Sequence, residues 1–449
     1  MKKTLLLLSL IISIKSFSQL ITAGGDHSLS ICTNNTLYAW GANASGQLGN
    51  GSNALSYVPV FISSVTDAKV VSASRLHTLV LKQDSTVWAC GDNTDGQLGD
   101  GTNTNKNTFV QVVNLTGVVK IASSYGTSFA LKNDSTVWAW GNGTAGQLGN
   151  GLNANSNIPV QVSNLTGIIA IGAGDSHALA VKSDGTVWAW GWNFYGQLGI
   201  GNNNDNNIPV QVTNISNAVS VGGGNGHSIA LKNDGTVWSW GINTFGELGN
   251  GNNTNTNTPV QVSTINSITT ISCGRNHSLA LKNDSTVWGW GINSNGRIGD
   301  GTTNDTNIPI QNLMSSVTDI SAGFDHSLAL KANGTLWGWG KNSTGQLGNG
   351  NNSFNNPTPL QVNGLCPPIT EISELSATET ILIFPNPTHS LLNIQINEAS
   401  IISISNVLGQ ELMNKRIQTN EVIDFSNFEN GIYFVKELKS GRTIKFIKQ

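Results

Sequence analysis

Six histidines recur at one position of a repeated segment, and histidine is the side chain most often used for acid–base chemistry and metal binding near neutral pH. They are His27, His77, His177, His227, His277 and His326, and Thr127 takes their place in the third copy. A catalytic or metal centre needs one asymmetric set of groups, whereas a residue present in nearly every copy serves something that each copy needs. We therefore expect these histidines to donate buried hydrogen bonds to neighbouring strands, and we predict no catalytic residue, no metal site and no cofactor.

Two further loop types resemble binding motifs, and turn geometry explains both. The Gly-Gln-Leu-Gly segment, for example Gly146 to Gly149, is followed by no Lys-Ser/Thr pair and no expected helix, so it is not a phosphate loop. The loops at 202–207 and 300–307 lack the ordered carboxylates and the bidentate glutamate of a calcium loop. We expect solvated turns in which glycine supplies backbone conformations that other residues adopt only at a cost.

Positions that vary between copies are the ones that can distinguish a partner. One variable series stands two residues before the repeated histidine and comprises Gly25, Arg75, Tyr125, Asp175, Asn225, Arg275 and Phe324. The other follows each Trp-Gly, where aromatic residues occur in the fourth and fifth copies: Trp192, Phe194, Tyr195 and Phe245. Because strand direction reverses at each hairpin and two strands separate the series, both should emerge on one face. Exposed aromatic clusters are typical anchors of protein or sugar recognition, and packing beneath neighbouring loops is the alternative.

A repeat that runs through most of the chain must position these residues. Its marker is a glycine after the second tryptophan position, with five intervals of 50 residues and one of 49: Gly41, Gly91, Gly141, Gly191, Gly241, Gly291 and Gly340. One copy contains four short strand patterns, at 159–162, 168–172, 178–182 and 186–190. Four antiparallel strands repeated seven times are typical of a β-propeller, so the predicted fold class is all-β, with a seven-bladed β-propeller over residues 19–365.

The two ends of the array predict how the ring closes. The first copy starts at Leu20 and lacks the leading Pro-Val-Gln-Val strand of the other copies. The last copy ends in Pro359-Leu360-Gln361-Val362, which has the same pattern. We expect this last strand to complete the first blade and to lock the ring.

The N-terminus has the layout of a secretory signal peptide over residues 1–18. Two lysines precede an apolar run from Thr4 to Ile14, and small residues follow near the expected cleavage after Ser18. This run is too short for a convincing membrane span, and no later stretch reaches spanning length. The sequence therefore predicts export and no transmembrane segment.

Export places four cysteines in an oxidising compartment, where three pairings are possible. Cys32 with Cys366 would tie the ends of the ring together, and the spacing of the four fits no zinc pattern. Cys90 stands where other copies have tryptophan, so we expect a buried apolar thiol there.

Composition argues against two classes of partner. Charged residues make up 11% of the chain and the formal net charge is -3. No basic field is available to capture a phosphate backbone, so nucleic acid is not an expected partner, and a role on a membrane surface has no support either.

The repeated motifs WAWG, GQLGNG, PVQV and HSLALKND resemble repeats of the regulator of chromosome condensation family, and the resemblance covers Leu20 to Leu365. It implies a seven-bladed propeller. The eukaryotic founder of the family is a nucleotide exchange factor for a small GTPase that sits on chromatin. Secreted bacterial relatives include protein inhibitors of β-lactamases, which bind their target with one face of the propeller.

The C-terminal segment has a different character, because charge density rises from about Ser376 and the repeat stops. Alternation at Leu392, Ile394 and Ile396 predicts a small β-sandwich. Segments at 383–388, 406–410 and 430–436 resemble the C-terminal sorting domain of type IX secretion substrates. We assign a linker to residues 366–380 and the sorting domain to residues 381–449. The resemblance implies passage across an outer membrane, removal of this domain, and then release or attachment to surface lipopolysaccharide.

Together these patterns predict a secreted or cell-surface binding scaffold of a Gram-negative bacterium, adhesin-like and monomeric, whose partners are an extracellular protein or glycan and the type IX machinery. A proteinaceous inhibitor of a secreted enzyme is the alternative, and it would use the same face with tight one-to-one binding. An extracellular polymer-degrading enzyme would need Arg75, Tyr125, Asp175 and Arg275 to converge with further acid and base groups.

Overall fold

The computed structural model describes residues 20–365, 382–384, 386, 388, 390–396, 399–407, 410–438 and 443–448. The chain divides into two compact units, Met1–Cys366 and Pro367–Gln449. Within the described residues, no helix has the length and apolar character needed to cross a membrane. The predicted signal peptide at 1–18 and the predicted linker at 366–380 lie outside the described residues.

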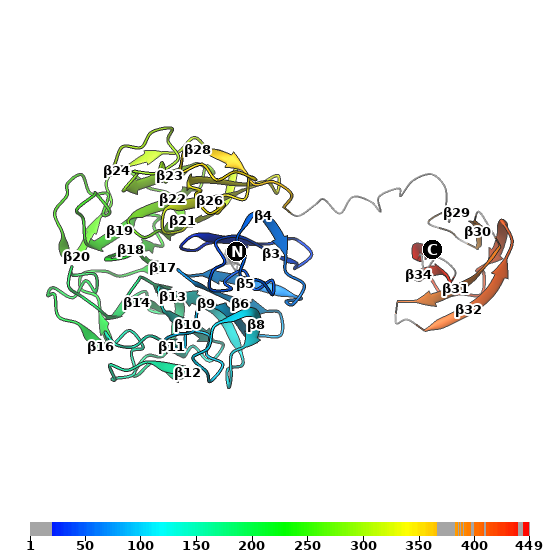
Figure 1. The fold of residues 1–449 in the computed structure, drawn as a ribbon, viewed down its shortest axis with the longest axis horizontal. Helices are drawn as coiled ribbons and strands as arrows, with labels where there is room; N and C mark the ends of the chain where they lie inside the picture. The colour runs from blue at the N-terminus through cyan, green and yellow to red at the C-terminus, as the bar shows by residue number, and fades with distance from the viewer. Residues whose placement is uncertain are drawn as a thin grey trace, which may run out of the picture. The chain divides into compact units, whose positions relative to one another are not determined.

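Residues 20–365 form seven four-stranded antiparallel sheets, or blades, arranged around a common centre (Figure 1). Blades 1 to 3 contain β1 (Ile21–Ala23), β2 (His27–Ile31), β3 (Leu37–Gly41), β4 (Ser56–Phe61), β5 (Ala68–Ala73), β6 (His77–Lys82), β7 (Val87–Gly91), β8 (Lys106–Gln111), β9 (Val118–Ser123), β10 (Thr127–Lys132), β11 (Val137–Gly141) and β12 (Ser156–Gln161). Blades 4 and 5 contain β13 (Ile168–Ala173), β14 (His177–Lys182), β15 (Val187–Gly191), β16 (Asn206–Gln211), β17 (Ala218–Gly223), β18 (His227–Lys232), β19 (Val237–Gly241) and β20 (Thr256–Gln261). Blades 6 and 7 contain β21 (Ile268–Cys273), β22 (His277–Lys282), β23 (Val287–Gly291), β24 (Thr306–Gln311), β25 (Val317–Ala322), β26 (His326–Lys331), β27 (Leu336–Lys341) and β28 (Asn355–Gln361).

The predicted fold class is confirmed, but the predicted mode of ring closure is wrong. The outermost strand of blade 1 is β4, and β28 pairs with β27 of blade 7, with Trp337 opposite Gln361. Each blade is therefore one continuous stretch of chain. The Pro-Val-Gln-Val strand ends the blade that precedes it instead of leading the next one, because it hydrogen-bonds to the Trp-Xaa-Trp strand before it, as β12 does to β11.

Period-2 alternation places the two repeated tryptophans of a blade on one face, with different surroundings. In β15, Trp190 is fully buried, and its Nε1 donates to the carbonyl of Gln147 in the preceding blade at 2.9 Å. Trp188 is half-buried, and the Lys182 ammonium lies 5.3 Å from its ring centroid. The inner tryptophan therefore seals the interface between blades, while the outer one packs near the rim under a lysine.

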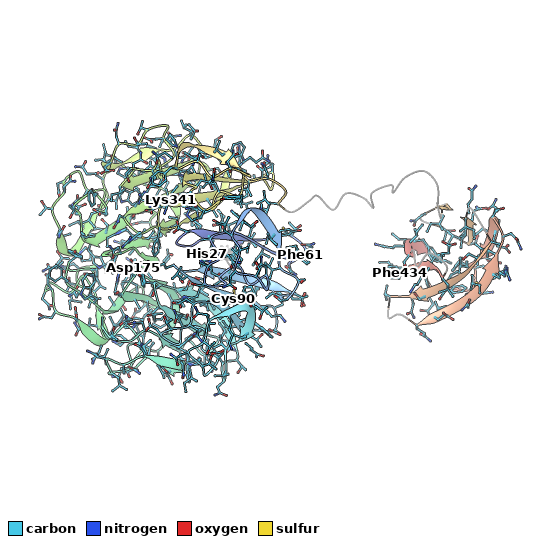
Figure 2. The ribbon with its side chains drawn as sticks, viewed as in Figure 1. His27, Phe61, Cys90, Asp175, Lys341 and Phe434 are labelled. Carbon is cyan, nitrogen blue, oxygen red and sulfur yellow. The ribbon has the colours of Figure 1, made fainter. Side chains whose placement is uncertain are left out.

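The recurrent histidines join neighbouring blades, as expected from their repetition. His177 Nε2 lies 2.8 Å from Ser228 Oγ of the next blade, and that hydroxyl donates at 2.8 Å to the Gln197 carbonyl oxygen. Because the serine proton is engaged, the neutral histidine must carry its proton on Nε2 and donate it. The same Gln197 carbonyl also accepts from Trp240 Nε1 at 2.8 Å. Equivalent pairs are His27 with Thr78, His77 with Ser128, His227 with Ser278, His277 with Ser327 and His326 with Ser28, and His27 is labelled in Figure 2.

At the junction between blades 3 and 4, both members of this polar pair are replaced. Thr127 replaces the histidine of blade 3, and Ala178 replaces the serine of blade 4. An apolar contact occurs there instead, with the Phe129 and Trp190 rings 6.3 Å apart in an edge-on arrangement. Loss of both partners together avoids a buried unpaired donor, which is more costly than a missing hydrogen bond.

The Gly-Gln-Leu-Gly turns need glycine for the reason that the sequence suggested. Gly146 and Gly149 have φ of +79° and +65°. A Cβ on Gly149 would also lie 2.7 Å from Trp190 Nε1. The turn therefore lets the indole approach closely enough to reach the Gln147 carbonyl.

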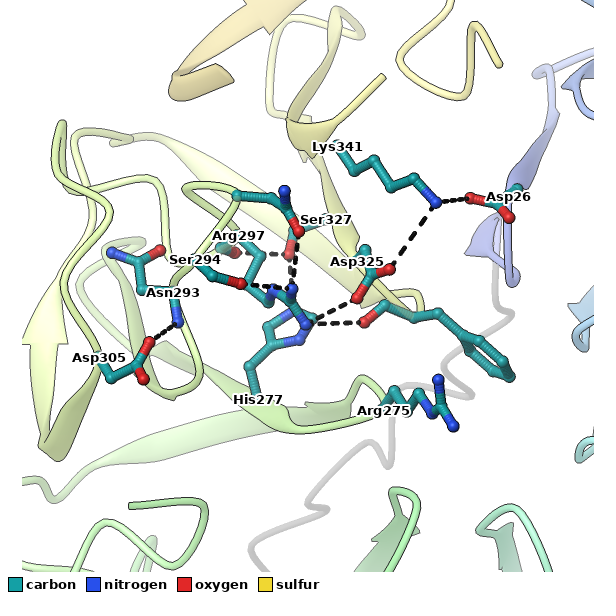
Figure 3. Close-up of polar contacts among 12 residues, drawn as sticks. Asp26, Arg275, His277, Asn293, Ser294, Arg297, Asp305, Asp325, Ser327 and Lys341 are labelled. Atoms are coloured by element: carbon teal, nitrogen blue, oxygen red, sulfur yellow. Dashed lines mark hydrogen bonds and ion pairs between the residues drawn. The ribbon is translucent and has the colours of Figure 1, made fainter. Parts of the chain in front are cut away.

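Blades 1 and 7 meet through the same contacts and a set of ion pairs (Figure 3). Ser28 Oγ and Trp40 Nε1 of blade 1 donate to the Gln346 carbonyl at 2.8 and 2.9 Å. Lys341 Nζ of blade 7 lies 3.0 Å from Asp26 Oδ1 of blade 1. Asp325 lies 3.9 Å from that ammonium and 2.8 Å from Arg297 Nη1 of blade 6. Direct contact between first and last blades therefore closes the ring without any exchange of strands.

The cysteines differ in environment. Cys90 is a buried free thiol whose pKa is raised by burial, as its place in the tryptophan position predicts. Cys273 is also free and half-buried. Cys32 is disulfide-bonded, and its predicted partner Cys366 lies outside the described residues.

The C-terminal unit is built from two antiparallel sheets around an apolar core of its own. One sheet has the order β29 (Leu382–Phe384), β30 (Leu391–Gln395), β33 (Asn420–Asp424), and the other has the order β32 (Glu411–Ile417), β31 (Ser400–Asn406), β34 (Gly431–Glu437), β35 (Thr443–Lys448). Leu392, Ile394 and Ile396 are buried in this core, as their alternation predicts.

Ser228→Ala should lower the free energy of unfolding by about 1–3 kcal/mol, because the His177 N–H loses its buried acceptor. Urea denaturation of the full chain measures this change. Ser163→Ala, a half-buried loop serine of blade 3, is the control and should stay within about 0.5 kcal/mol of the parent. Equal stability of the two variants would contradict the structural role of the histidine pair.

Acidification should destabilise the propeller well above the pH at which ordinary carboxylates titrate. Burial lowers the pKa of all six histidines, to about 3 for four of them, so the unfolded chain binds protons below pH 6.5 that the folded chain does not. Two aspartates oppose this effect, since burial raises the pKa of Asp175 to about 6 and that of Asp319 to about 7.

Unfolding near pH 5 therefore binds about four protons net, so each unit by which the pH falls lowers the free energy of unfolding by about 5 kcal/mol. The stabilising contribution of the histidines is thus present above pH 6.5 and lost as the pH falls towards 3. Melting temperatures between pH 7.5 and pH 4.5 measure the slope, and Asp175→Asn should steepen it. A flat profile would contradict the buried neutral histidines.

Candidate ligand-binding face

The two variable loop series emerge on the same face of the propeller. Loops between the first and second strands of a blade contact loops between the third and fourth strands of the blade before it. Arg297 Nη1 donates to the Phe324 carbonyl at 3.3 Å, and Thr344 Oγ1 donates to the Asp26 carbonyl at 3.2 Å. A Cβ on Gly226 would lie 2.8 Å from the Tyr195 ring. We call this side of the molecule the variable face.

Three of the predicted aromatic residues form one cluster on this face. Trp192 and Phe194 are nearly parallel, with ring centroids 6.0 Å apart. Tyr195 meets both rings edge-on, at 5.4 Å from Trp192 and 5.0 Å from Phe194. Phe194 is 64% exposed, while Trp192 and Tyr195 are half-buried. We call these three residues the aromatic patch.

Phe245 lies on the next blade, apart from these three rings. Its side chain is 42% exposed, and its backbone N–H donates to Glu247 Oε2 at 2.8 Å. The structure therefore brings together three of the four predicted aromatics and leaves Phe245 as a separate exposed ring.

Five members of the other variable series converge at the centre of the ring from five different blades. Tyr125 and Phe324 stack with centroids 6.4 Å apart and planes 21° from parallel. The Arg75 guanidinium carbon lies 4.4 Å from the Tyr125 centroid, and that of Arg275 lies 5.5 Å from the Phe324 centroid. Arg275 Nε is also 3.7 Å from Asp175 Oδ2. We call these five residues the channel cluster.

Four residues of the channel cluster line a small cavity, of about 70 Å³, at the ends of the innermost strands, and Arg75 lies outside this lining. These four are Tyr125, Asp175, Arg275 and Phe324, and the rest of the lining is Cys273 with glycine, alanine and serine residues. The buried histidines dictate the small residues, since a Cβ on Gly174 would lie 2.2 Å from His177 Cε1. The contacts that join the blades therefore also leave the centre of the face open.

Asp175 has an unusual acidity. Burial raises its pKa to about 6, and the nearby charges of Arg275 and Arg75 oppose that shift. Its protonation therefore changes between pH 5 and pH 7, while both guanidinium groups remain charged. The cavity consequently carries more positive charge at pH 5 than at pH 7.

Two charged residues on this side were not predicted from the sequence. Glu247 and Arg297 stand at the glutamine position of the Gly-Gln-Leu-Gly turn, and both are buried. Arg297 pairs with Asp325, whereas Glu247 Oε1 has no hydrogen-bond partner and burial raises the pKa of its carboxyl group. Departure from the repeat was the signal that could have found them. In the described parts of both units, no group of three or more His, Cys, Asp or Glu side chains is arranged to hold a metal ion.

Family models match nearly the whole chain. Residues 6–315 match the RCC1-like domain, and residues 317–346 and 333–373 match the regulator of chromosome condensation (RCC1) repeat. Residues 382–449 match the secretion system C-terminal sorting domain. No curated protein matches this chain.

Solved structures support the same fold. Human WBSCR16 is 24% identical with a TM-score of 0.64, and the match covers 70% of this chain and 87% of that one. Yeast RCC1 (Prp20) bound to Kap60 is 22% identical with a TM-score of 0.67, covering 79% and 87%. Prp20p from Saccharomyces cerevisiae, studied with its binding properties to Gsp1p and histones, is 22% identical with a TM-score of 0.67, covering 78% and 87%.

At sequence identities below 25%, these structures support a shared fold but do not assign their binding partners to this chain. The RCC1-like model alone spans more than half of the chain, and the repeat models cover the seventh blade. The protein therefore belongs to the RCC1-like family of seven-bladed β-propellers, and its C-terminal unit is a type IX sorting domain that marks it for export to the cell surface or the medium.

Proposed function

We propose that this protein is an exported binding module that recognises an extracellular partner through the variable face, with the aromatic patch as its anchor. The observation that carries the proposal is the exposure of Phe194, 64% of whose surface is open to solvent beside the Trp192 and Tyr195 rings of the same loop. Large exposed aromatic side chains are enriched at the energetic centres of interfaces.

The aromatic patch is also ordered in advance of binding. Trp192 supports one face of the Phe194 ring, and Tyr195 contacts it edge-on. Tyr195 packs in turn against the loop of the next blade at Gly226. Rings held by their neighbours lose little conformational freedom when a partner covers them, so more of the contact energy remains as affinity.

Inhibition of a secreted enzyme is a narrower version of the same proposal, because an inhibitor would use the same face with tight one-to-one binding. Catalysis has less support. Asp175 provides the single carboxyl group among the described residues that line the central cavity. General acid–base chemistry on a polymer normally uses two such groups.

Export is the second part of the proposal. Residues 1–18 would direct the chain across the inner membrane, and residues 381–449 would engage the type IX machinery and then be removed. The propeller, residues 19–365, would remain as the functional part, either released or attached at the outer surface. The match of residues 382–449 to a sorting domain supports this route.

Replacing the aromatic patch should abolish capture of the partner. The purified full chain and a Trp192→Ala, Phe194→Ala, Tyr195→Ala variant are used as baits on culture medium and cell-envelope extract, followed by mass spectrometry and glycan analysis. Loss of three anchor rings should weaken binding at least about 100-fold.

Leu313→Ala provides the matched control. Leu313 is 62% exposed and lies between β24 and β25, on the side opposite the variable face. The control should capture the same partner as the parent chain. Equal capture by the aromatic variant and the parent would rule out the patch as the anchor.

Removing residues 382–449 should retain the propeller inside the cell. Immunoblots of cell, envelope and medium fractions from a type IX-competent bacterium follow its distribution. The intact chain should reach the surface or the medium in a shortened form, whereas the truncated chain should accumulate in the periplasm. Appearance of the truncated chain outside the cell would contradict sorting by this domain.

A further inference from the structure

The channel cluster contains more hydrogen-bond donors than acceptors. Each guanidinium group presents five N–H donors. Among the residues that the structure describes, Arg75 makes no side-chain hydrogen bond or ion pair, and it is positioned by the Tyr125 ring. Arg275 approaches Asp175 through Nε alone, at 3.7 Å, which leaves its two terminal nitrogens without a described partner. The site therefore has unused capacity for an anion.

The planar donors favour one kind of anion. An arginine fork matches the two oxygens of a carboxylate, and stacking on an aromatic ring fixes the plane in which the fork lies. Arg75 and Arg275 are both held in this way, over Tyr125 and Phe324. Of the two, Arg275 lines the central cavity, so a carboxylate in that cavity would replace water with directed, charge-assisted hydrogen bonds from Arg275.

The size of the cavity limits what can carry that carboxylate. A volume of about 70 Å³ is enough for a few water molecules. Pockets for drug-sized ligands measure about 300–1,000 Å³. The cavity can admit an anionic group on a narrow stem, such as an aspartate or glutamate side chain, and it is smaller than a pocket for a drug-sized ligand.

We propose that the channel cluster is a receptor for one acidic side chain of a protein partner, with Arg275 binding its carboxylate, the charge of Arg75 adding to the attraction, and Asp175 competing for the Arg275 guanidinium group. This inference rests on the proposed binding function and specifies the chemistry of the partner. The aromatic patch would contribute the apolar part of the same interface.

Asp175 makes the site sensitive to pH. The groups that face it are Arg275 on the loop after β21, Arg75 on the loop after β5 and the ring of Tyr125 on the loop after β9. When Asp175 is ionised it occupies part of the donor capacity of Arg275 and repels an incoming carboxylate. Once it is protonated, that competition ends. With a pKa of about 6, the neutral fraction of Asp175 falls about tenfold between pH 5 and pH 7.

The test uses the full chain and two capped peptides, acetyl-Gly-Glu-Gly-amide and acetyl-Gly-Gln-Gly-amide, titrated at pH 5 and pH 7 with ligand-observed NMR. The glutamate peptide should bind with a dissociation constant on the order of 1 mM at pH 5 and about tenfold more weakly at pH 7. The glutamine peptide should not bind. Arg275→Ala should weaken binding at least about tenfold. Arg75→Ala should weaken binding less than Arg275→Ala does, because the Arg75 charge acts from outside the cavity, and Lys69→Ala, which removes the same charge elsewhere in blade 2, should leave binding unchanged.

Asp175→Asn separates competition from simple charge attraction. It should bind the glutamate peptide at pH 7 as well as the parent chain does at pH 5, and the pH dependence should vanish. Weaker binding by this variant at pH 7 would overturn the role given to Asp175. Glucuronate forms a third arm, and binding equal to that of the glutamate peptide would overturn the assignment to a protein side chain.

Failure here is distinguishable from failure of the proposed function. If neither pH supports binding of the glutamate peptide, the receptor is refuted, while capture of a partner through the aromatic patch remains a separate result. Melting temperatures of the arginine variants within 2 °C or so of the parent show that lost binding reflects the site and not unfolding.

Discussion

A single carbonyl group in each Gly-Gln-Leu-Gly turn holds this ring together. The Gln197 carbonyl accepts from both the Trp240 indole and the Ser228 hydroxyl of the next blade, and that hydroxyl accepts from His177, which lies in the same blade as Gln197. All of these groups are buried, so a missing member would leave an unpaired polar atom away from water. The conformation of the turn, the glycines beside the indole and the neutral state of the histidine follow from this one arrangement.

The same arrangement separates structural from variable positions. The fixed His177 ring leaves no room for a Cβ on Gly174, whereas Asp175, the residue after that glycine, lines the cavity at the centre of the ring and is free of this constraint. The residue equivalent to Gly174 is glycine in blades 1 and 4 to 7 and serine in blades 2 and 3, and the position after it can carry a different side chain in each blade. The channel cluster is the sum of these independent choices, and it combines two arginines, an aspartate and two aromatic rings in one small space.

Departures from the repeated sequence occur at particular junctions between blades. Lys341 pairs with Asp26 across the seam between the last and first blades, and Asp325 links this lysine to Arg297 of blade 6, which gives a chain of ion pairs found at no other place within residues 20–365. At the junction of blades 3 and 4, the polar pair is lost on both sides and an aromatic contact takes its place. The seam thus gains charge complementarity that distinguishes the two terminal blades from each other and from their neighbours.

The sequence by itself determined the seven repeats, the four strands of each blade, the structural role of the histidines and the alternation of the C-terminal sandwich. Each of these is a local pattern, imposed by the burial of one strand face or by a turn that needs glycine. Only the tertiary structure decided that the Pro-Val-Gln-Val strand belongs to the blade before it, because strand pairing depends on hydrogen bonds that no local pattern specifies. It also decided that Arg75, Tyr125, Asp175, Arg275 and Phe324 meet, since residues in five separate blades become neighbours only when the ring closes.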